Sequence, residues 1–80
     1  MSSSALHLRF QRVSKGAGVT RIERLNLHPT LKEQLLSELK KKLGCGGAVK
    51  DGVLEFQGDH RDKLEPVLVA KGYAVKRVGG

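Results

Sequence analysis

Few residues in this sequence carry chemistry of their own, and their spacing decides what they could do. Cys45 could share a metal ion with His7, His28 and His60, but no C-x-x-C or H-x3-H spacing is present. Structural zinc sites use such spacings to bring four ligands to one ion. A single free cysteine more often packs as a small hydrophobic residue. The sequence therefore predicts no metal site and no cofactor.

A glycine-rich stretch, Leu43 to Lys63, reads LGCGGAVKDGVLEFQGDHRDK and could be imagined to cradle a phosphate. A P-loop requires G-x-x-x-x-G-K-[ST], and the stretch that begins at Gly44 lacks the serine or threonine of that motif. Asp59 and His60 are an acid and a base, yet they are sequence neighbours with no accompanying nucleophile. We interpret the glycines as turn residues and expect a protein that is not an enzyme.

The net charge indicates the class of partner. Fifteen Lys and Arg against eight Asp and Glu give +7, and residues 51–80 hold equal numbers of each sign, so the excess lies in residues 1–50. Phosphates attract such a surface regardless of base sequence, which favours nucleic acid as the partner. A basic surface that serves only solubility is the plainer alternative.

The composition also predicts a small cytoplasmic protein without a membrane segment. One cysteine cannot form an internal disulfide, which indicates a reducing compartment. No apolar run approaches the roughly 20 residues of a membrane span, and MSSSALHLRF lacks the charged start and apolar centre of a signal peptide. We expect a monomer with a disordered tail at residues 1–4 and one domain at residues 5–80.

The first elements that must position the basic residues are two strands. Residues 6–11, LHLRFQ, alternate apolar with polar and predict a strand with one buried face. The turn is expected at Ser14 to Gly18, where glycines allow positive φ angles. Residues 19–25, VTRIERL, are rich in β-branched residues, but their apolar members fall three apart, which suggests a strand with a bulge.

A helix should follow this hairpin. Thr30 and Glu33 form a T-x-x-E capping box after Pro29. Gly44 comes directly after the last periodic leucine and is expected to end the helix in a left-handed conformation. The apolar side of the predicted helix consists of Leu31, Leu35, Leu36, Leu39 and Leu43.

The second half predicts another hairpin, a helix and a strand. Asp51-Gly52 lies between two β-prone runs, which is a strong hairpin signal. Asp59 is expected to cap a helix that ends at Gly72, and residues 73–78 form the last strand. The apolar side of this helix is predicted to consist of Leu64, Val67, Leu68 and Val69. The order β-β-α-β-β-α-β indicates an α+β fold, a two-layer sandwich with both helices on one face of a single sheet.

The basic residues of the first half form the candidate RNA-binding set. A run such as Lys40–Lys42 is usually a solvated helix face, but it joins the hairpin bases in one cationic surface if the hairpin and the helix terminus share an edge. Phe10, Phe56 and Tyr73 are the three aromatic residues, so recognition of RNA shape and backbone is favoured over an aromatic base-stacking platform. The predicted RNA-binding residues are Arg9, Arg12, Lys15, Gly16, Arg21, Arg24, Lys40, Lys41 and Lys50.

The terminal Gly79-Gly80 raises a different class of function. Ubiquitin-like modifiers and sulfur carriers end in Gly-Gly because a thin tail can enter the channel of an activating enzyme. The full second helix fits that fold poorly. A generic regulator that binds structured RNA is the other alternative.

Several motifs together resemble the SUI domain of the eukaryotic translation initiation factor one family, in particular its archaeal and short bacterial members. The likeness covers nearly the whole chain. It includes a Cys-x-Gly block, a Lys-Asp turn and Gln-Gly-Asp-x-Arg in order, matched by Cys45, Gly47, Lys50, Asp51, Gln57, Gly58, Asp59 and Arg61. The resemblance implies a mixed five-stranded sheet with two helices on one side.

The resemblance also implies a function. Members bind the small ribosomal subunit near the P site and influence the selection of initiator tRNA and start codon, so rRNA, initiator tRNA and other initiation factors are the implied partners. They use the basic tip of the first hairpin, which here spans residues 14–18 and carries one lysine where typical members carry several bases. A second functional turn or helix cap is implied at Gln57, Gly58, Asp59, His60 and Arg61, where we expect Asp59 to cap the helix.

Overall fold

The computed structural model describes residues 5–78. The tail predicted for residues 1–4 and the terminal Gly79-Gly80 lie outside the described residues. The predicted element order is confirmed: β1 (Leu6–Ser14), β2 (Ala17–Glu23), α1 (Pro29–Leu43), β3 (Gly47–Lys50), β4 (Val53–Gln57), α2 (Arg61–Ala70) and β5 (Val75–Val78).

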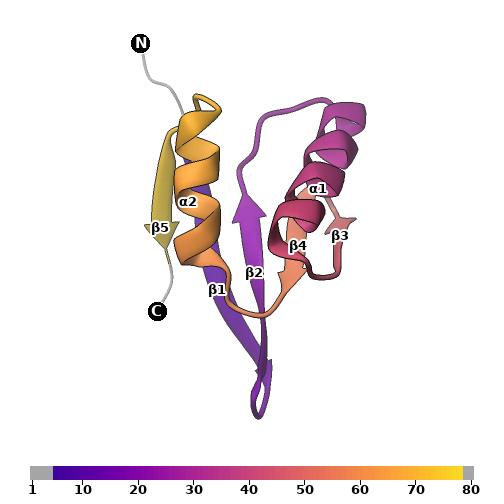
Figure 1. Ribbon diagram of the computed structural model, residues 1–80, viewed down its shortest axis with the longest axis vertical. Helices are drawn as coiled ribbons and strands as arrows, with labels where there is room; N and C mark the ends of the chain where they lie inside the picture. The colour runs from indigo at the N-terminus through magenta and orange to yellow at the C-terminus, as the bar shows by residue number, and fades with distance from the viewer. Residues whose placement is uncertain (1–4, 79–80) are drawn as a thin grey trace.

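The strands form one mixed sheet in the order β3-β4-β2-β1-β5. β5 runs parallel to β1, and the other neighbours pair antiparallel. Both helices lie on the same face, α1 against β3 and β4 and α2 against β1 and β5 (Figure 1). The α+β two-layer sandwich expected from the sequence is therefore confirmed, and no helix among residues 5–78 covers the opposite face of the sheet. Neither α1 nor α2 is long and apolar enough to cross a membrane.

The core lies between the sheet and the two helices. Alternation in β1 buries Leu6 and Leu8, as the sequence predicts. In β2 the buried positions are Gly18, Thr20 and Ile22. The core cluster consists of Leu6, Leu8, Ile22, Leu25, Leu35, Leu36, Leu39, Leu54, Phe56, Leu64 and Leu68.

The bulge predicted for residues 19–25 is wrong. β2 alternates regularly, and the register shift falls in β1 between Arg12 and Ser14. The apolar residues of β2 are three apart because Thr20, a polar residue, occupies a fully buried core position. The departure from apolar alternation therefore marks a buried hydroxyl, not an extra residue.

The predicted start of α1 is also wrong. The helix begins at Pro29, and His28 is its N-cap, with His28 Nδ1 accepting the amide of Thr30 at 3.2 Å. Proline suits the first helical position because its φ is already helical and the amide it lacks would have no partner there. Thr30 is thus the second helical residue, two positions after the N-cap. Leu31 is 47 % exposed, because this turn extends beyond the core.

At α2 the cap is displaced by one residue. The N-cap is His60, and Asp59 precedes it. Leu64 and Leu68 are buried and Val67 packs against the core, as predicted, but Val69 is 54 % exposed and points away.

The predicted turn glycines adopt the conformations that the sequence indicates. Gly44 ends α1 at φ +66°, and Asp51 and Gly52 form the β3–β4 turn at φ +51° and +78°. Gly72 follows α2 at φ +96°.

Replacing Gly44 with Ala tests the helix stop. No neighbouring atom lies within 4 Å of the added Cβ, so the expected loss of about 1 kcal/mol in unfolding free energy comes from the left-handed backbone alone. Urea unfolding measures the loss. The control is Gly46→Ala, where φ is not positive and the nearest atom, Gln57 Cγ, is 3.9 Å away. Equal stabilities for the two variants would contradict this account of the turn.

Candidate nucleic-acid interface

The β1–β2 hairpin extends beyond the rest of the sheet at one end of the molecule (Figure 1). Its tip is Lys15-Gly16, with Gly16 at φ +74°. Arg12 and Lys15 are exposed, and neither has an ion-pair partner within residues 5–78. The hairpin therefore presents two unpaired cations on a narrow projection.

The turn between β4 and α2 is fastened to the base of this hairpin by Thr20. The Thr20 hydroxyl donates to the carbonyl of Gly58 at 2.6 Å and accepts from the amide of His60 at 2.9 Å. The amide of Gly58 donates to the carbonyl of Gly18 at 2.9 Å. Thr20 is fully buried, and no other polar side chain is buried among the described residues. Two regions that the sequence predicted as separate sites thus form one unit.

Arg61 completes the contact between turn and hairpin. Its guanidinium lies 5.3 Å from the ring centroid of Phe10 in β1 and donates to both carboxylate oxygens of Asp59, at 2.9 and 2.8 Å. Asp59 also accepts the amide of Arg61 at 3.3 Å. The expected cap is therefore a weak bond to the first helical amide, and the main partner of Asp59 is the guanidinium. These hydrogen bonds from Arg61 lower the pKa of Asp59.

Gly18 is required where the Phe10 ring crosses β2. A Cβ at Gly18 would lie 2.3 Å from Phe10 Cζ, closer than atoms can approach. The absence of a side chain lets the ring lie against the backbone of β2 beneath Arg61.

The C-terminus of α1 and the loop after it lie at the same end of the molecule. The carbonyl of Gly46 accepts the amide of Gln57 at 3.0 Å, which joins this loop to the β4–α2 turn. Figure 1 shows α1 ending and α2 beginning at the end where the hairpin projects. We call residues 12–18, 40–46 and 57–63 together the hairpin end.

Lys40 and Lys41 therefore share an end with the hairpin, as the predicted cationic surface requires. Cys45, in the loop after α1, packs against the core, where burial raises the pKa of its thiol and the charges of Lys40 and Lys63 oppose the rise. Lys42 and Lys63 also belong to the hairpin end, although the predicted RNA-binding set omitted both. Lys63 was missed because the charges of residues 51–80 sum to zero. In the structure its acidic neighbours Asp62 and Glu65 bind Arg77, at 2.8 and 2.6 Å, and so do not pair with Lys63.

Arg9 and Arg21 lie on the uncovered face of the sheet and are already paired. Arg9 Nε donates to Glu23 at 3.1 Å, and Arg21 Nη1 donates to Gln11 at 2.8 Å. Arg21 Nε lies 3.5 Å from carboxylate oxygens of both Glu23 and Glu55. This alternating network neutralises the arginines, so they are less available to phosphates than the lysines of the hairpin end.

Arg24 and Lys50 lie at the opposite end of the sheet. Arg24 follows the last residue of β2, roughly 25 Å along an extended strand from Gly16. Lys50 precedes the β3–β4 turn, whose Gly52 carbonyl accepts from Lys32 at the start of α1. Of the nine predicted RNA-binding residues, the structure brings together Arg12, Lys15, Gly16, Lys40 and Lys41 at the hairpin end.

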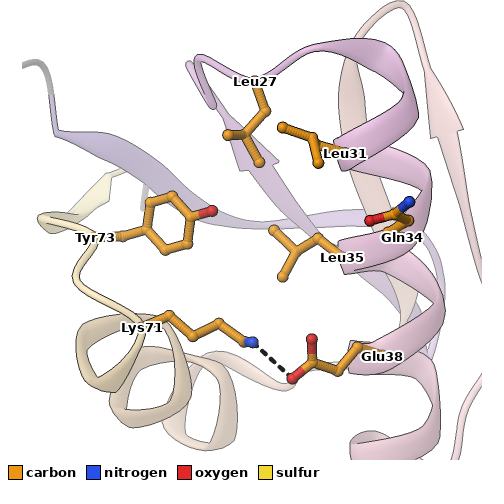
Figure 2. A pocket seen from close by; sticks show the side chains of 7 residues that line it. All are labelled: Leu27, Leu31, Gln34, Leu35, Glu38, Lys71 and Tyr73. Atoms are coloured by element: carbon orange, nitrogen blue, oxygen red, sulfur yellow. Dashed lines mark ion pairs between the residues drawn. The ribbon is translucent and has the colours of Figure 1, made fainter.

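The remaining described surface offers no metal site but has a groove outside the hairpin end. Among residues 5–78, no group of three or more His, Cys, Asp or Glu could hold a metal ion. A groove of about 320 Å³ lies between α1 and the segment after α2 (Figure 2). Its walls include Leu31 and Tyr73, and an ion pair of 2.6 Å between Lys71 and Glu38 closes one side. The groove contains none of the predicted site residues.

Comparison with known proteins identifies the family of this chain. The family model described as Translation initiation factor SUI1 matches residues 2–74. The chain belongs to the SUI1 family. It is 56 % identical over 66 residues to YciH, an uncharacterised protein of Escherichia coli (strain K12), covering 82 % of this chain and 61 % of YciH.

Archaeal members of the SUI1 family are also similar. The chain is 43 % identical over 58 residues to a protein translation factor SUI1 homolog of Sulfolobus acidocaldarius, covering 72 % of this chain and 59 % of that protein. The homolog of Ignicoccus hospitalis is 37 % identical over 73 residues, with coverages of 91 % and 70 %. The resemblance inferred from Cys45 to Arg61 is thus confirmed, and SUI1 factors are not enzymes. The chain spans about three fifths of the length of YciH.

Replacing Thr20 tests the link between turn and hairpin. Thr20→Val keeps the side-chain shape but leaves the partly buried Gly58 carbonyl and His60 amide without their hydroxyl partner, so we expect a loss of about 1–3 kcal/mol in unfolding free energy. Thr20→Ser is the control, which keeps the hydroxyl and loses only a methyl group. Hydrogen exchange at the His60 amide should accelerate in the Val variant and stay slow in the Ser variant. Slow exchange in both would contradict the assigned role.

The ion pair of Asp59 and Arg61 predicts a pH dependence. Because the pKa of Asp59 is lowered in the folded state, the pair stabilises the fold above the pKa of an unfolded Asp and is lost as pH falls through the lower, folded value. Arg61→Gln should raise the Asp59 pKa toward its ordinary value, measured by NMR titration of the carboxyl carbon. Arg77→Gln removes the same charge from a different pair and should leave the titration of Asp59 unchanged. An unchanged titration in Arg61→Gln would refute the pairing.

Proposed function

We propose that this protein is a translation initiation factor that binds the small ribosomal subunit near the P site and modulates the selection of initiator tRNA and start codon. The observation that carries the proposal is the gathering, at the hairpin end of a SUI1-family fold, of cations that have no ion-pair partner among residues 5–78. Those cations are Arg12, Lys15, Lys40, Lys41, Lys42 and Lys63.

The mechanism requires positioning and no chemistry. Lysines on α1 and α2 would bind rRNA phosphates, which supplies affinity without reading sequence. The hairpin would then project from the bound domain toward the decoding region. A projection fixed at its base by Thr20 can disfavour a mismatched codon–anticodon complex through steric contact and charge, and so act as a gate on initiation.

The partners follow from that position. We infer that rRNA is the primary partner, with initiator tRNA and other initiation factors as neighbours on the subunit. The protein would act as a monomer in the cytoplasm, because a single projecting hairpin and its adjoining lysines suffice for the contact.

A generic regulator that binds structured RNA is the second candidate. It is favoured by one observation, that the cations of the hairpin end are suited to the phosphate backbone of any folded RNA. The two candidates differ in competition: unrelated structured RNA should displace a generic binder from small ribosomal subunits at concentrations near its own affinity, and should not displace an initiation factor.

Neutralising the α1 terminus tests the proposal. The double variant Lys40→Gln and Lys41→Gln should weaken binding to small ribosomal subunits and reduce the slope of log affinity against log salt by about 2, one per phosphate contact. The control is Arg24→Gln with Lys50→Gln, which removes the same charge at the opposite end of the sheet. Fluorescence anisotropy across a salt series measures both. Equal losses in the two double variants would show that net charge, not the hairpin end, governs binding.

A further inference from the structure

A hollow of about 250 Å³ lies between the hairpin and the β4–α2 turn, separate from the groove in Figure 2. We propose that this hollow accommodates the base of one unpaired RNA nucleotide, with a preference for guanine. The inference rests on the proposed function, since it assumes that the hairpin end faces RNA. The hollow is lined by Phe10, Arg12, Gly16, Ala17, Gly18, Gly58 and Asp59.

The shape of the hollow suits a single planar group. Three of its seven lining residues are glycines, so much of its wall is bare backbone. Gly18 cannot be replaced without displacing the ring of Phe10, which supplies an aromatic wall. Pockets for drug-sized ligands occupy roughly 300–1,000 Å³, so this smaller hollow fits one ring system, and aromatic walls are where unstacked bases bind.

The polar groups favour guanine over adenine and cytosine. The Asp59 carboxylate is 46 % exposed, and its Oδ2 accepts only the Arg61 bond, which leaves an acceptor site free. The lowered pKa keeps this carboxylate ionised and therefore acceptor-only at neutral pH. Guanine presents two adjacent N–H donors on its Watson–Crick edge. Adenine and cytosine place an acceptor beside their amino group, which a carboxylate repels.

Arg12 supplies the contact expected for the phosphate of the same nucleotide. It lines the hollow, is exposed, and has no ion-pair partner within the described part of the chain. A base in the hollow with its phosphate on Arg12 would place the neighbouring phosphate toward Lys15 at the tip. The hollow thus adds one base-reading position to a surface that otherwise binds backbone.

Base-substituted RNA heptamers test the inference without any mutation. Four uridine heptamers are compared, whose central residue is guanosine, inosine, adenosine or an abasic ribose, so that every probe carries the same phosphates. We expect the guanosine heptamer to bind about tenfold more tightly than the adenosine and abasic heptamers, with inosine intermediate because it lacks the 2-amino donor. Anisotropy at low salt gives the affinities, and NMR shifts at the Gly18 and Gly58 amides locate the site.

A pair of variants assigns the preference to Asp59. Asp59→Asn should abolish the discrimination between guanosine and adenosine, whereas Asp62→Asn, which removes the same charge from a residue paired with Arg77, should retain it. Equal affinity of the guanosine and abasic heptamers, or an unchanged preference in Asp59→Asn, would overturn the inference. In either case salt-sensitive binding that depends on Lys40 and Lys41 would leave the proposed function intact. If the unmodified protein shows no such binding to small ribosomal subunits, the proposed function is refuted instead.

Discussion

The hydroxyl of Thr20 makes two hydrogen bonds to the β4–α2 turn: it donates to the Gly58 carbonyl and accepts from the His60 amide. No other polar side chain among the described residues is buried in the core. A buried hydroxyl without partners costs free energy, so the turn must stay against β2 for the core to be satisfied. That constraint fixes the start of α2, places Arg61 over Phe10 and holds the base of the hairpin to the domain.

The distribution of charge follows from this arrangement. On the uncovered face of the sheet, Arg9 and Arg21 alternate with Glu23 and Glu55, so cations and carboxylates satisfy one another. On the flank of α2, Arg77 occupies Asp62 and Glu65. Because these arginines are paired with carboxylates, most of the unneutralised positive charge lies on the lysines of the hairpin end. A domain of this size buries only a modest core, and its surface therefore carries the recognition.

Local rules allowed much of the fold to be predicted from sequence. Gly44 and the Asp51-Gly52 pair specify their turns through backbone sterics alone, which require no knowledge of tertiary contacts. The N-cap predicted at Thr30 was wrong because Pro29 is itself able to begin the helix, two residues earlier than a Thr30 cap would allow. The prediction that Val69 belongs to the apolar side of α2 was wrong for a different reason. The short helix carries more apolar residues than the sheet can cover, and Val69 stays exposed.

The site was less predictable, because it depends on contacts between distant segments. In the sequence, nothing distinguishes Arg9 and Arg21 from arginines that are free to bind phosphates. Only the pairing of β2 with β4 reveals that Glu55 lies beside Arg21. Lys63 was missed because it lies in residues 51–80, whose charges sum to zero. The irregular apolar spacing of residues 19–25 was interpreted as a bulge, although it reflects the buried hydrogen-bonding role of Thr20.

Electron cryomicroscopy of the protein bound to small ribosomal subunits tests the central claim most directly, because it shows which surface faces the rRNA. We predict that residues 12–18, 40–46 and 57–63 contact rRNA together, with the hairpin directed toward the P site and the groove of Figure 2 facing away. A bound orientation in which the uncovered face of the sheet or the Leu31–Tyr73 groove contacts the rRNA, with the hairpin end in solvent, would contradict this account.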